Sequence, residues 1–333
     1  MKHNIKTSII LLTMFIIIQI VGIFIINAYS PTLNISNNQT LNTTSLASTD
    51  LPFGLEDESA SNPISIILTF LLAFFIISIL LKYKLKLVLR TWFLIVTIIA
   101  IGITINGFLL NISNQNITWA IALSTGIIFG FLKVFKPNKY IHNFTEIFIY
   151  PGIATILVTT IYNPNKPGLN IILMLILLVL ISTYDIWGVW KSKLMTKIAK
   201  YEMEEVKIFG GLIIPYISKK DKLKIKKLKK KYKEKRIPNI AIQKKKIKVS
   251  AAILGGGDIA FTIVTMGVFM WTFPQQVLFG IHGLIPALFI LLGSILGLSY
   301  IFFFGDPKKP YPAMPYITTG IFTMLLIWKM IFF

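Results

Sequence analysis

Runs of about twenty consecutive apolar residues recur along this sequence, and they limit its possible folds more than any other feature. A helix of that length crosses the ~30 Å hydrocarbon core of a bilayer, where backbone groups must find partners within the protein. The composition agrees, because 55% of the residues are hydrophobic and only 14% are charged, against about 25% in soluble domains. We predict an all-α, polytopic membrane protein with nine transmembrane helices. They cover residues 8–28, 63–81, 91–110, 117–132, 143–161, 168–190, 249–271, 281–304 and 311–333.

The distribution of basic residues predicts how these helices are oriented. The chain has 34 Lys and Arg against 13 Asp and Glu, a formal net charge of +21. If the N-terminus is cytoplasmic, 32 of the 34 basic residues fall on the cytoplasmic side, and only Lys166 and Lys329 lie outside. Cytoplasmic loops of membrane proteins carry an excess of Lys and Arg. The distribution therefore favours nine spans, with the N-terminus cytoplasmic and the C-terminus outside.

The first span and the loop after it have features of a secreted or surface segment. The first apolar run begins with basic residues, as cleavable signal peptides do, but it is longer than their apolar core of about 7–15 residues, so we expect a retained helix. The loop at 29–62 has no Lys or Arg and carries three Asn-x-Ser/Thr sequons, at Asn34, Asn38 and Asn42. These are compatible with glycosylation, although such tripeptides also arise by chance in loops rich in Asn, Ser and Thr.

A basic segment divides the chain into residues 1–190, with the first six spans, and residues 249–333, with the last three. The segment itself, 191–248, holds 21 of the 34 basic residues, and its self-repulsion should keep it partly disordered. We expect it to contact anionic lipid headgroups. Nucleic acid is not expected as a partner, because no aromatic or Arg stacking pattern is interleaved with the lysines. Within it, an apolar patch at 208–217 is suited to lie at the membrane interface.

Two of the few acidic residues lie inside predicted spans, Asp185 in the sixth and Asp258 in the seventh. A carboxylate at that depth is costly unless it faces a cavity or a partner, so each is a functional-site hypothesis. In regular helices the two would lie about 9 Å and about 15 Å from the cytoplasmic ends of their spans, and antiparallel neighbours could bring them into one pocket. Glu146, within a turn of the cytoplasmic end of the fifth span, is instead expected to reach water.

Two carboxyl groups a few ångströms apart share one proton, so that one acts as a base toward water and the other as an acid toward a scissile carbonyl. A proton relay or an ion site in a transporter or channel needs a similar pair. A membrane chaperone without catalysis is a third, weaker alternative. We see no inverted repeat of the kind found in transporters. No metal or other cofactor is expected, because the chain has no Cys and its His are scattered, at His3, His142 and His282.

Two backbone features near the carboxylates favour an enzyme site. Three consecutive glycines precede Asp258. They let another backbone approach the carboxyl group, although glycine also serves tight packing of membrane helices. The segment 310–315 has three prolines where the ninth span begins, so its backbone should be extended or irregular. Such backbone at membrane depth is tolerated where it is buried in protein or lines a cavity, though proline is also common in the first turn of a helix.

Taken together, the Tyr-Asp pair ending at Asp185, the Gly-x-Gly-Asp pattern ending at Asp258 and the Pro-Ala-Met-Pro at 312–315 resemble the presenilin and signal peptide peptidase family of intramembrane aspartyl proteases. The motif order, the nine spans and the long loop extend the resemblance over the whole chain, whose proportions are most similar to those of archaeal presenilin homologues. It implies a presenilin-like fold with Asp185 and Asp258 as the catalytic pair. Met314 stands where the family usually has Leu, a swap of nearly equal volume. The residues that it implies at the active site or in substrate binding are Tyr184, Gly255, Gly256, Gly257, Pro312, Ala313, Met314 and Pro315.

The resemblance also implies an activity, that of an aspartic endopeptidase that cleaves within the transmembrane segments of other proteins or peptides. It implies a multi-pass integral protein, in the plasma membrane of a prokaryote and specifically of an archaeon. Water should reach the pair from the cytoplasmic side, and we expect the segment near Pro312 to present unpaired backbone to an unwound substrate. Residues 207–217 occupy the place of the family's interfacial helix and loop cleavage region. The residues favour neither self-cleavage nor an intact loop there.

Overall fold

The computed structural model describes residues 5–31, 86–110, 114–136, 138–191, 209–216, 250–305 and 311–333. The predicted second span, the three sequons and most of the basic segment lie outside these residues. The described part is mostly helical, with one two-stranded sheet. Its elements are, in chain order, α1 (Ile5–Ala28), α3 (Lys86–Leu109), α4 (Gln115–Phe135), α5 (Lys139–Ile161), α6 (Pro167–Ile186), the π-helical turn η3 (Trp187–Lys191), β1 (Gly211–Tyr216), β2 (Ser250–Gly255), α10 (Gly256–Thr272), α11 (Leu284–Phe304) and α12 (Met314–Phe332).

The helices have the length and composition of membrane spans. Seven stretches among the described residues are long and apolar enough to cross a bilayer, namely α1, α3, α4, α5, α6 with its π-helical turn, α11 and α12. α10 is equally apolar but has only 17 residues. The predicted class, a helical polytopic membrane protein, is therefore confirmed.

The predicted seventh span is wrong in its first part, because the chain enters it as a strand. β2 pairs antiparallel with β1, with Ile213 opposite Ile253, and the helix starts only at Gly256. A short apolar run cannot be assigned to strand or helix from its periodicity alone, and the pairing partner lies beyond the basic segment. A strand rises about 3.3 Å per residue against about 1.5 Å in a helix. The depth predicted for Asp258 from a continuous helix therefore does not hold.

β1 lies within the apolar patch at 208–217. Residues 207–217 occupy the place of the family's interfacial helix, but in this chain residues 211–216 form a strand. Its single proline, Pro215, stands opposite Ala251, and proline is found in sheets where its position needs no amide donor toward the partner strand.

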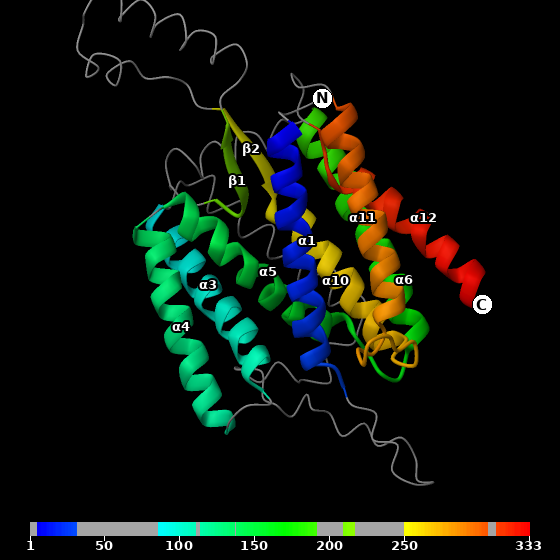
Figure 1. Ribbon diagram of the computed structural model, residues 1–333, viewed down its shortest axis with the longest axis horizontal. Coiled ribbons are helices and arrows are strands. Elements are labelled where there is room, and N and C mark those ends of the chain that lie inside the picture. Colours follow the sequence, from blue (N-terminus) through cyan, green and yellow to red (C-terminus); the bar gives the residue numbers. More distant parts are fainter. Residues whose placement is uncertain are drawn as a thin grey trace, which may run out of the picture.

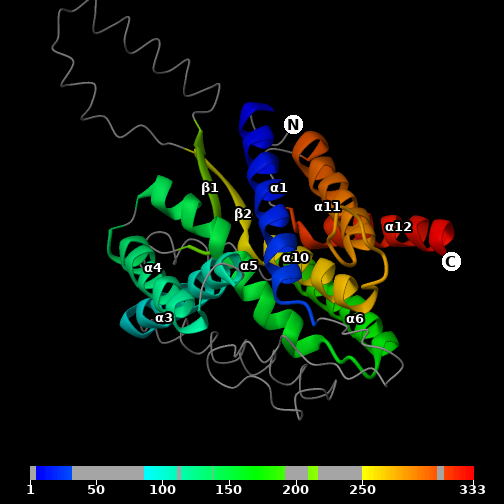
Figure 2. The ribbon, with the colours of Figure 1, turned by 60° about the horizontal axis from the view of Figure 1, so that its bottom comes forward.

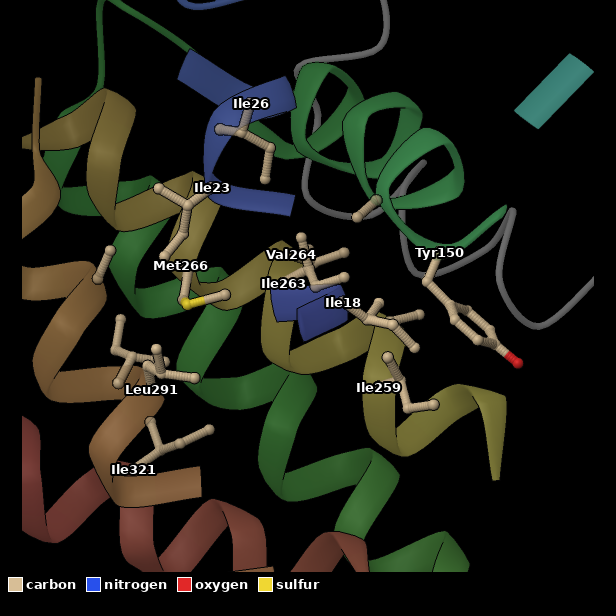
Figure 3. Packing of buried hydrophobic residues seen from close by; sticks show 14 of the residues in the cluster. Ile18, Ile23, Ile26, Tyr150, Ile259, Ile263, Val264, Met266, Leu291 and Ile321 are labelled. Carbon is tan, nitrogen blue, oxygen red and sulfur yellow. The ribbon is translucent and has the colours of Figure 1, made fainter. Parts of the chain in front are cut away.

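α10 is the central helix of the described structure. It packs against α1, α5, α6 and α11, and nearly every residue from Ile259 to Trp271 is buried. Figures 1 and 2 show it between α1 and α6, and Figure 3 shows its apolar side chains meeting those of α1. Gly22 of α1 leaves the room that the side chain of Ile263 fills. Two long-range hydrogen bonds, Gln19 Nε2 to the carbonyl of Ile259 and Trp271 Nε1 to the carbonyl of Ile26, both at 3.1 Å, fix α10 along α1.

α11 and α12 approach each other through glycines. A Cβ on Gly293 would lie against the backbone of Gly320, and one on Gly297 against the backbone of Tyr316. Small residues four apart let two membrane helices come into backbone contact, where packing replaces the missing hydrophobic drive. This contact determines where α12 begins, and with it the position of the prolyl segment (Figure 1).

Candidate active site

Asp185 lies in the last turn of α6, next to the π-helical turn that ends this helix. Its side chain is half-buried and reaches α12, where its Oδ2 accepts a hydrogen bond from the backbone amide of Met314 at 3.1 Å. Met314 is the first residue of α12. The sequence prediction thus placed Asp185 correctly on its helix, and the structure joins it directly to the Pro-Ala-Met-Pro segment.

The first turn of α12 has unpaired backbone amides, and this explains why a carboxylate from another helix fits there. The first amides of a helix have no partner within it, and a Ser, Thr, Asp or Asn at the N-cap normally satisfies one of them. Here the N-cap is Ala313, which makes no side-chain cap, and Pro315 has no amide hydrogen. The side chain of Asp185 fills this role from another helix, and the positive end of the α12 dipole favours its negative charge.

One turn earlier on α6 and one turn later on α12, a second polar contact joins the two helices. The hydroxyls of Ser182 and Thr318 lie 2.7 Å apart, both buried. Ser182 precedes Asp185 by three residues and Thr318 follows Met314 by four, so the pair lies on the same facing sides as the carboxylate and its donor. The two contacts together fix the axial position of α6 against α12.

Asp258 lies in the first turn of α10, directly after the glycines. Gly255 is the N-cap and has an extended backbone, so it belongs to the strand rather than to the wall of a helix as predicted. A Cβ on Gly255 would stand 3.0 Å from Asp258 Oδ2, whereas no described atom lies within 4 Å of one on Gly257. The first glycine therefore makes room for the carboxyl group of this chain, and the third faces open space. The dipole of α10 favours a negative charge at Asp258 as well.

Gly256 makes room for a residue that the sequence reading did not single out. A Cβ at this position would stand 2.6 Å from the hydroxyl oxygen of Tyr150 on α5. Tyr150 is 4% exposed, and its ring lies at the edge of the apolar cluster with the hydroxyl pointing outward (Figure 3). Nothing in the local sequence of α5 marks it, because its partner comes about a hundred residues later.

Two polar residues of α5 hold β1 in place. Asn143 pairs with both backbone groups of Ile213, donating from Nδ2 to the carbonyl at 2.9 Å and accepting from the amide at 3.2 Å. Nε2 of His142 donates to the carbonyl of Gly211 at 2.8 Å. The outer edge of β1 is thereby covered, and the sheet that leads into Asp258 is anchored to α5.

Glu146 contradicts its prediction as a carboxylate in water. It is 1% exposed and accepts a hydrogen bond from Lys133 Nζ at 2.5 Å, while His142 Nε2 lies 3.5 Å from the same oxygen. Lys133 was predicted in a cytoplasmic loop, but α4 continues to Phe135 and buries it. The two side chains satisfy each other, which lets both charges leave water.

The remaining predicted residues surround these contacts. Tyr184 is half-buried beside Asp185, with its ring centroid 6.2 Å from that of Trp187. Pro312 and Met314 are buried. The two aspartates are on α6 and α10, which pack against each other, and the ends that carry them lie on the same side as the start of α12 (Figure 1). Among the described residues, no three His, Asp or Glu side chains gather as metal ligands would.

Comparisons with known proteins identify the family and the fold. The family model described as signal-peptide peptidase, presenilin aspartyl protease matches residues 12–333. Two crystal structures of a presenilin family intramembrane aspartate protease, in the C222 and P2 space groups, each share the fold with a TM-score of 0.52 and 16% sequence identity. The first match covers 95% of this chain and 94% of that one, and the second covers 96% of each. No curated protein matches the sequence. The chain belongs to the signal-peptide peptidase and presenilin family of aspartyl proteases, and it is an intramembrane aspartyl protease.

Proposed function

We propose that Asp185 and Asp258 are the catalytic pair of this protease and that its substrates are transmembrane segments of other proteins. One observation carries the assignment. Two half-buried carboxyl groups lie on α6 and α10, which pack against each other, and each is at the N-terminal end of a helix, α12 for Asp185 and α10 for Asp258. Tyr184, the three glycines and residues 312–315 then shape the pocket around the pair.

The chemistry follows from sharing one proton between two carboxyl groups. The ionised carboxyl takes a proton from water as the water oxygen attacks the scissile carbonyl carbon, and the protonated carboxyl gives its proton to the carbonyl oxygen. The resulting tetrahedral diol then loses its C–N bond. The amine leaves with a proton from the carboxyl that took one from water, and a diol hydroxyl returns its proton to the other carboxylate. The pair ends as it began, and the products are one acid and one amine.

The substrate must present an extended backbone, and the edge of β2 that faces away from β1 is suited to bind it. The amide of Gly256 donates to the carbonyl of Gly210 at 3.2 Å. Backbone groups alternate in direction along a strand, so those of every second residue counted from Gly256 point toward β1. The backbone groups of Ile253, like those of Ile213 on β1, therefore point away from the partner strand. On β1 the outward groups are taken by α5. Within the described residues no hydrogen bond uses the outward groups of Ile253. An extended segment can add there as a third strand, next to Asp258.

This location replaces the one predicted near Pro312. The amide of Met314 already donates to Asp185, so it is not free for a substrate. We assign the prolyl segment a different part, which is to hold the carboxylate of Asp185 through the first amide of α12. Met314, buried at this point, then lies between the carboxylate and the core.

The finer topology belongs to the same proposal. Nine spans, with the N-terminus cytoplasmic and the C-terminus outside, place 32 of the 34 basic residues on one side. Residues 1–190 then carry Asp185, residues 249–333 carry Asp258, and the basic segment between them contacts anionic lipid. The protein resides in the plasma membrane of a prokaryote, an archaeon.

The first test compares the wild type with Asp185→Asn and Asp258→Asn on a single-span model substrate in detergent, with fragments identified by mass spectrometry. Each substitution should lower cleavage by about 10³-fold or more, since it removes a proton-transfer group. Wild-type rates should be bell-shaped in pH, with two apparent constants that belong to the pair. Equal fragments from all three proteins would refute the assignment, as would the absence of cleavage together with an ion flux in liposomes that needs both aspartates.

A second test addresses the β2 edge. Ile253→Pro removes one outward amide and should lower kcat/KM by up to about tenfold, the weight of one hydrogen bond, with little loss of thermal stability. Leu254→Pro is the matched control, because its amide faces β1 and its loss should destabilise the sheet. If Ile253→Pro cleaves like the wild type, substrates do not add to β2.

A further inference from the structure

The hydroxyl of Tyr150 is buried and makes no hydrogen bond with the part of the chain that the structure describes. Tyr150 is 4% exposed, and no described residue lies in hydrogen-bond geometry with its hydroxyl oxygen. A buried hydroxyl left unsatisfied costs about 1–3 kcal/mol, and phenylalanine would fill the same space without that cost. A tyrosine in this place therefore needs a reason other than packing.

The surroundings of the hydroxyl point to the first turn of α10. It lies above Gly256, at the position where any Cβ would stand 2.6 Å away, and a Cβ on the preceding Gly255 would stand 3.0 Å from Asp258 Oδ2. Two carboxyl groups act on it, Glu146 one turn earlier on α5, which has the larger effect, and Asp258 on α10, which has the smaller. The position of Glu146 is already fixed by its bond from Lys133. The directing effect of a donor at Tyr150 would therefore fall mainly on Asp258.

We propose that Tyr150 is a positioning residue for Asp258, whose carboxyl group accepts a hydrogen bond from the Tyr150 hydroxyl when the site is engaged with substrate. The inference rests on the proposed role of Asp258 in catalysis. The hydroxyl fixes the direction of the carboxyl group and stabilises its ionised form, because a donor to a carboxylate favours the charge. Lys133 and Glu146, buried one turn behind, hold α5 so that the ring keeps its place.

The proposal gives the middle glycine of the Gly-Gly-Gly-Asp segment a reason specific to this chain. The first glycine makes room for Asp258 and the third faces open space, whereas the middle one makes room for the Tyr150 hydroxyl. Tyr150 and Gly256 are therefore coupled. A side chain at position 256 would push the ring away from Asp258, even though it touches neither aspartate.

Other titratable side chains lie on the helices around α10. On α5, and on α4 behind it, they include Glu146, His142 and Lys133, and on α6 they are Asp185 and Tyr184. α1 contributes only the exposed Lys6, and α11 only Tyr300 among titratable side chains. Tyr150→Phe leaves all of these in place and removes one oxygen atom. Its effect on Asp258 can thus be assigned to the hydroxyl.

The test uses the full-length protein with Tyr150→Phe and three readouts. We expect kcat to fall about tenfold, as for one hydrogen bond to a charged group, with KM unchanged. The titration midpoint of the infrared carboxyl band that Asp258→Asn abolishes should move up by about one pH unit, because the ionised form loses a donor. Thermal stability should stay equal or rise, since an unsatisfied hydroxyl has been removed.

Tyr29→Phe is the matched control. Tyr29 is equally buried, but its hydroxyl donates to the carbonyl of Ile103 and accepts from Asn106, both at 3.0 Å. Its loss should lower stability and leave kcat and the titration of Asp258 unchanged. A second variant, Gly256→Ala, should lower kcat and shift the carboxyl band in the same direction as Tyr150→Phe, and less than additively when combined with it.

The outcomes separate this inference from the proposed function. If the wild type cleaves and needs both aspartates, but Tyr150→Phe has the same kcat and the same carboxyl titration, the hydroxyl serves Glu146 or packing and the inference is overturned. If the aspartates prove unnecessary for cleavage, the proposed function fails. The infrared titration still decides then whether Tyr150 and Asp258 interact, because it needs no turnover.

Discussion

Asp185 takes its hydrogen-bond donor from a different helix, α12, whereas Asp258 lies in the first turn of its own helix, α10. The two helices that carry these residues also differ in how deeply they are buried. Among the described residues, α6 fully buries a single stripe of residues four apart, Asn170, Met174, Leu178 and Ser182, and its other residues are half-buried or exposed. α10 is buried on nearly all sides and is bound to α1 by two side-chain hydrogen bonds.

This difference indicates a division of labour within the site. The part that carries Asp258 is held rigidly, by the buried ion pair between α4 and α5 and by the hydrogen bonds of Asn143 to β1. The Asp185 side is held by fewer contacts along one stripe, so we expect it to yield when a substrate helix enters. If Asp185 and Asp258 are the catalytic pair, as proposed, the pair is completed when α6 and α12 pack against the part that carries Asp258.

The largest effect on stability is expected from breaking the buried ion pair behind Asp258. Lys133→Met removes the lysine that pairs with the buried carboxyl group of Glu146, and removing one partner of a buried pair costs about 3–5 kcal/mol. Apparent unfolding temperatures in detergent, at one scan rate, should fall sharply. The double variant with Glu146→Leu should recover most of the loss, because no buried charge is left alone. An equally low midpoint for the double variant would show that the pair itself contributes the stability.

A smaller loss of stability is expected from a change in the contact between α11 and α12. Gly297→Ala places a Cβ against the backbone of Tyr316 and should force α12 from α11, at a cost of about 1–3 kcal/mol. Cleavage should fall as well, because Met314 moves away from Asp185 with the start of α12. The matched control is Gly168→Ala, where no described atom lies within 4 Å of the new Cβ. Equal cleavage by both variants would mean that the start of α12 is not set by the glycine contact.

The smallest effect concerns the hydroxyl pair between α6 and α12. Ser182→Ala and Thr318→Val should each cost about 1 kcal/mol or less, as hydrogen bonds between membrane helices do. Combined, they should cost less than the sum of the two, which a double-mutant cycle of unfolding free energies measures. Additive losses would mean that the contact between the two hydroxyls contributes no coupling.

Much of this molecule can be predicted one helix at a time. The first span, predicted at 8–28, is found at Ile5–Ala28, and the sixth, predicted at 168–190, is found as α6 with its π-helical turn. Asp185 and Asp258 stand out because a carboxylate in an apolar run is costly wherever that run folds. These features depend only on residues next to one another in the chain.

The predictions that were wrong each depended on a distant partner. Residues 250–255 read as helix until β1 pairs with them, about forty residues back. Glu146 was expected to reach water, and Lys133 to lie in a loop, because neither reveals from its neighbours that the other neutralises it. His142, Asn143 and Tyr150 look like ordinary polar residues of α5, since the strand and the glycine that they meet come more than sixty residues later.

By itself, the sequence determined that the chain is a helical membrane protein with two intramembrane carboxylates. The length of an apolar run and the cost of a charge within it are local properties that the bilayer imposes. Only the tertiary structure decided the surroundings of each carboxylate, with Asp185 on the amide of Met314 and Asp258 in a helical turn whose Gly256 meets the Tyr150 hydroxyl. Hydrogen-bond partners and backbone contacts are made between helices far apart in the chain, and no spacing along it records which of them will meet.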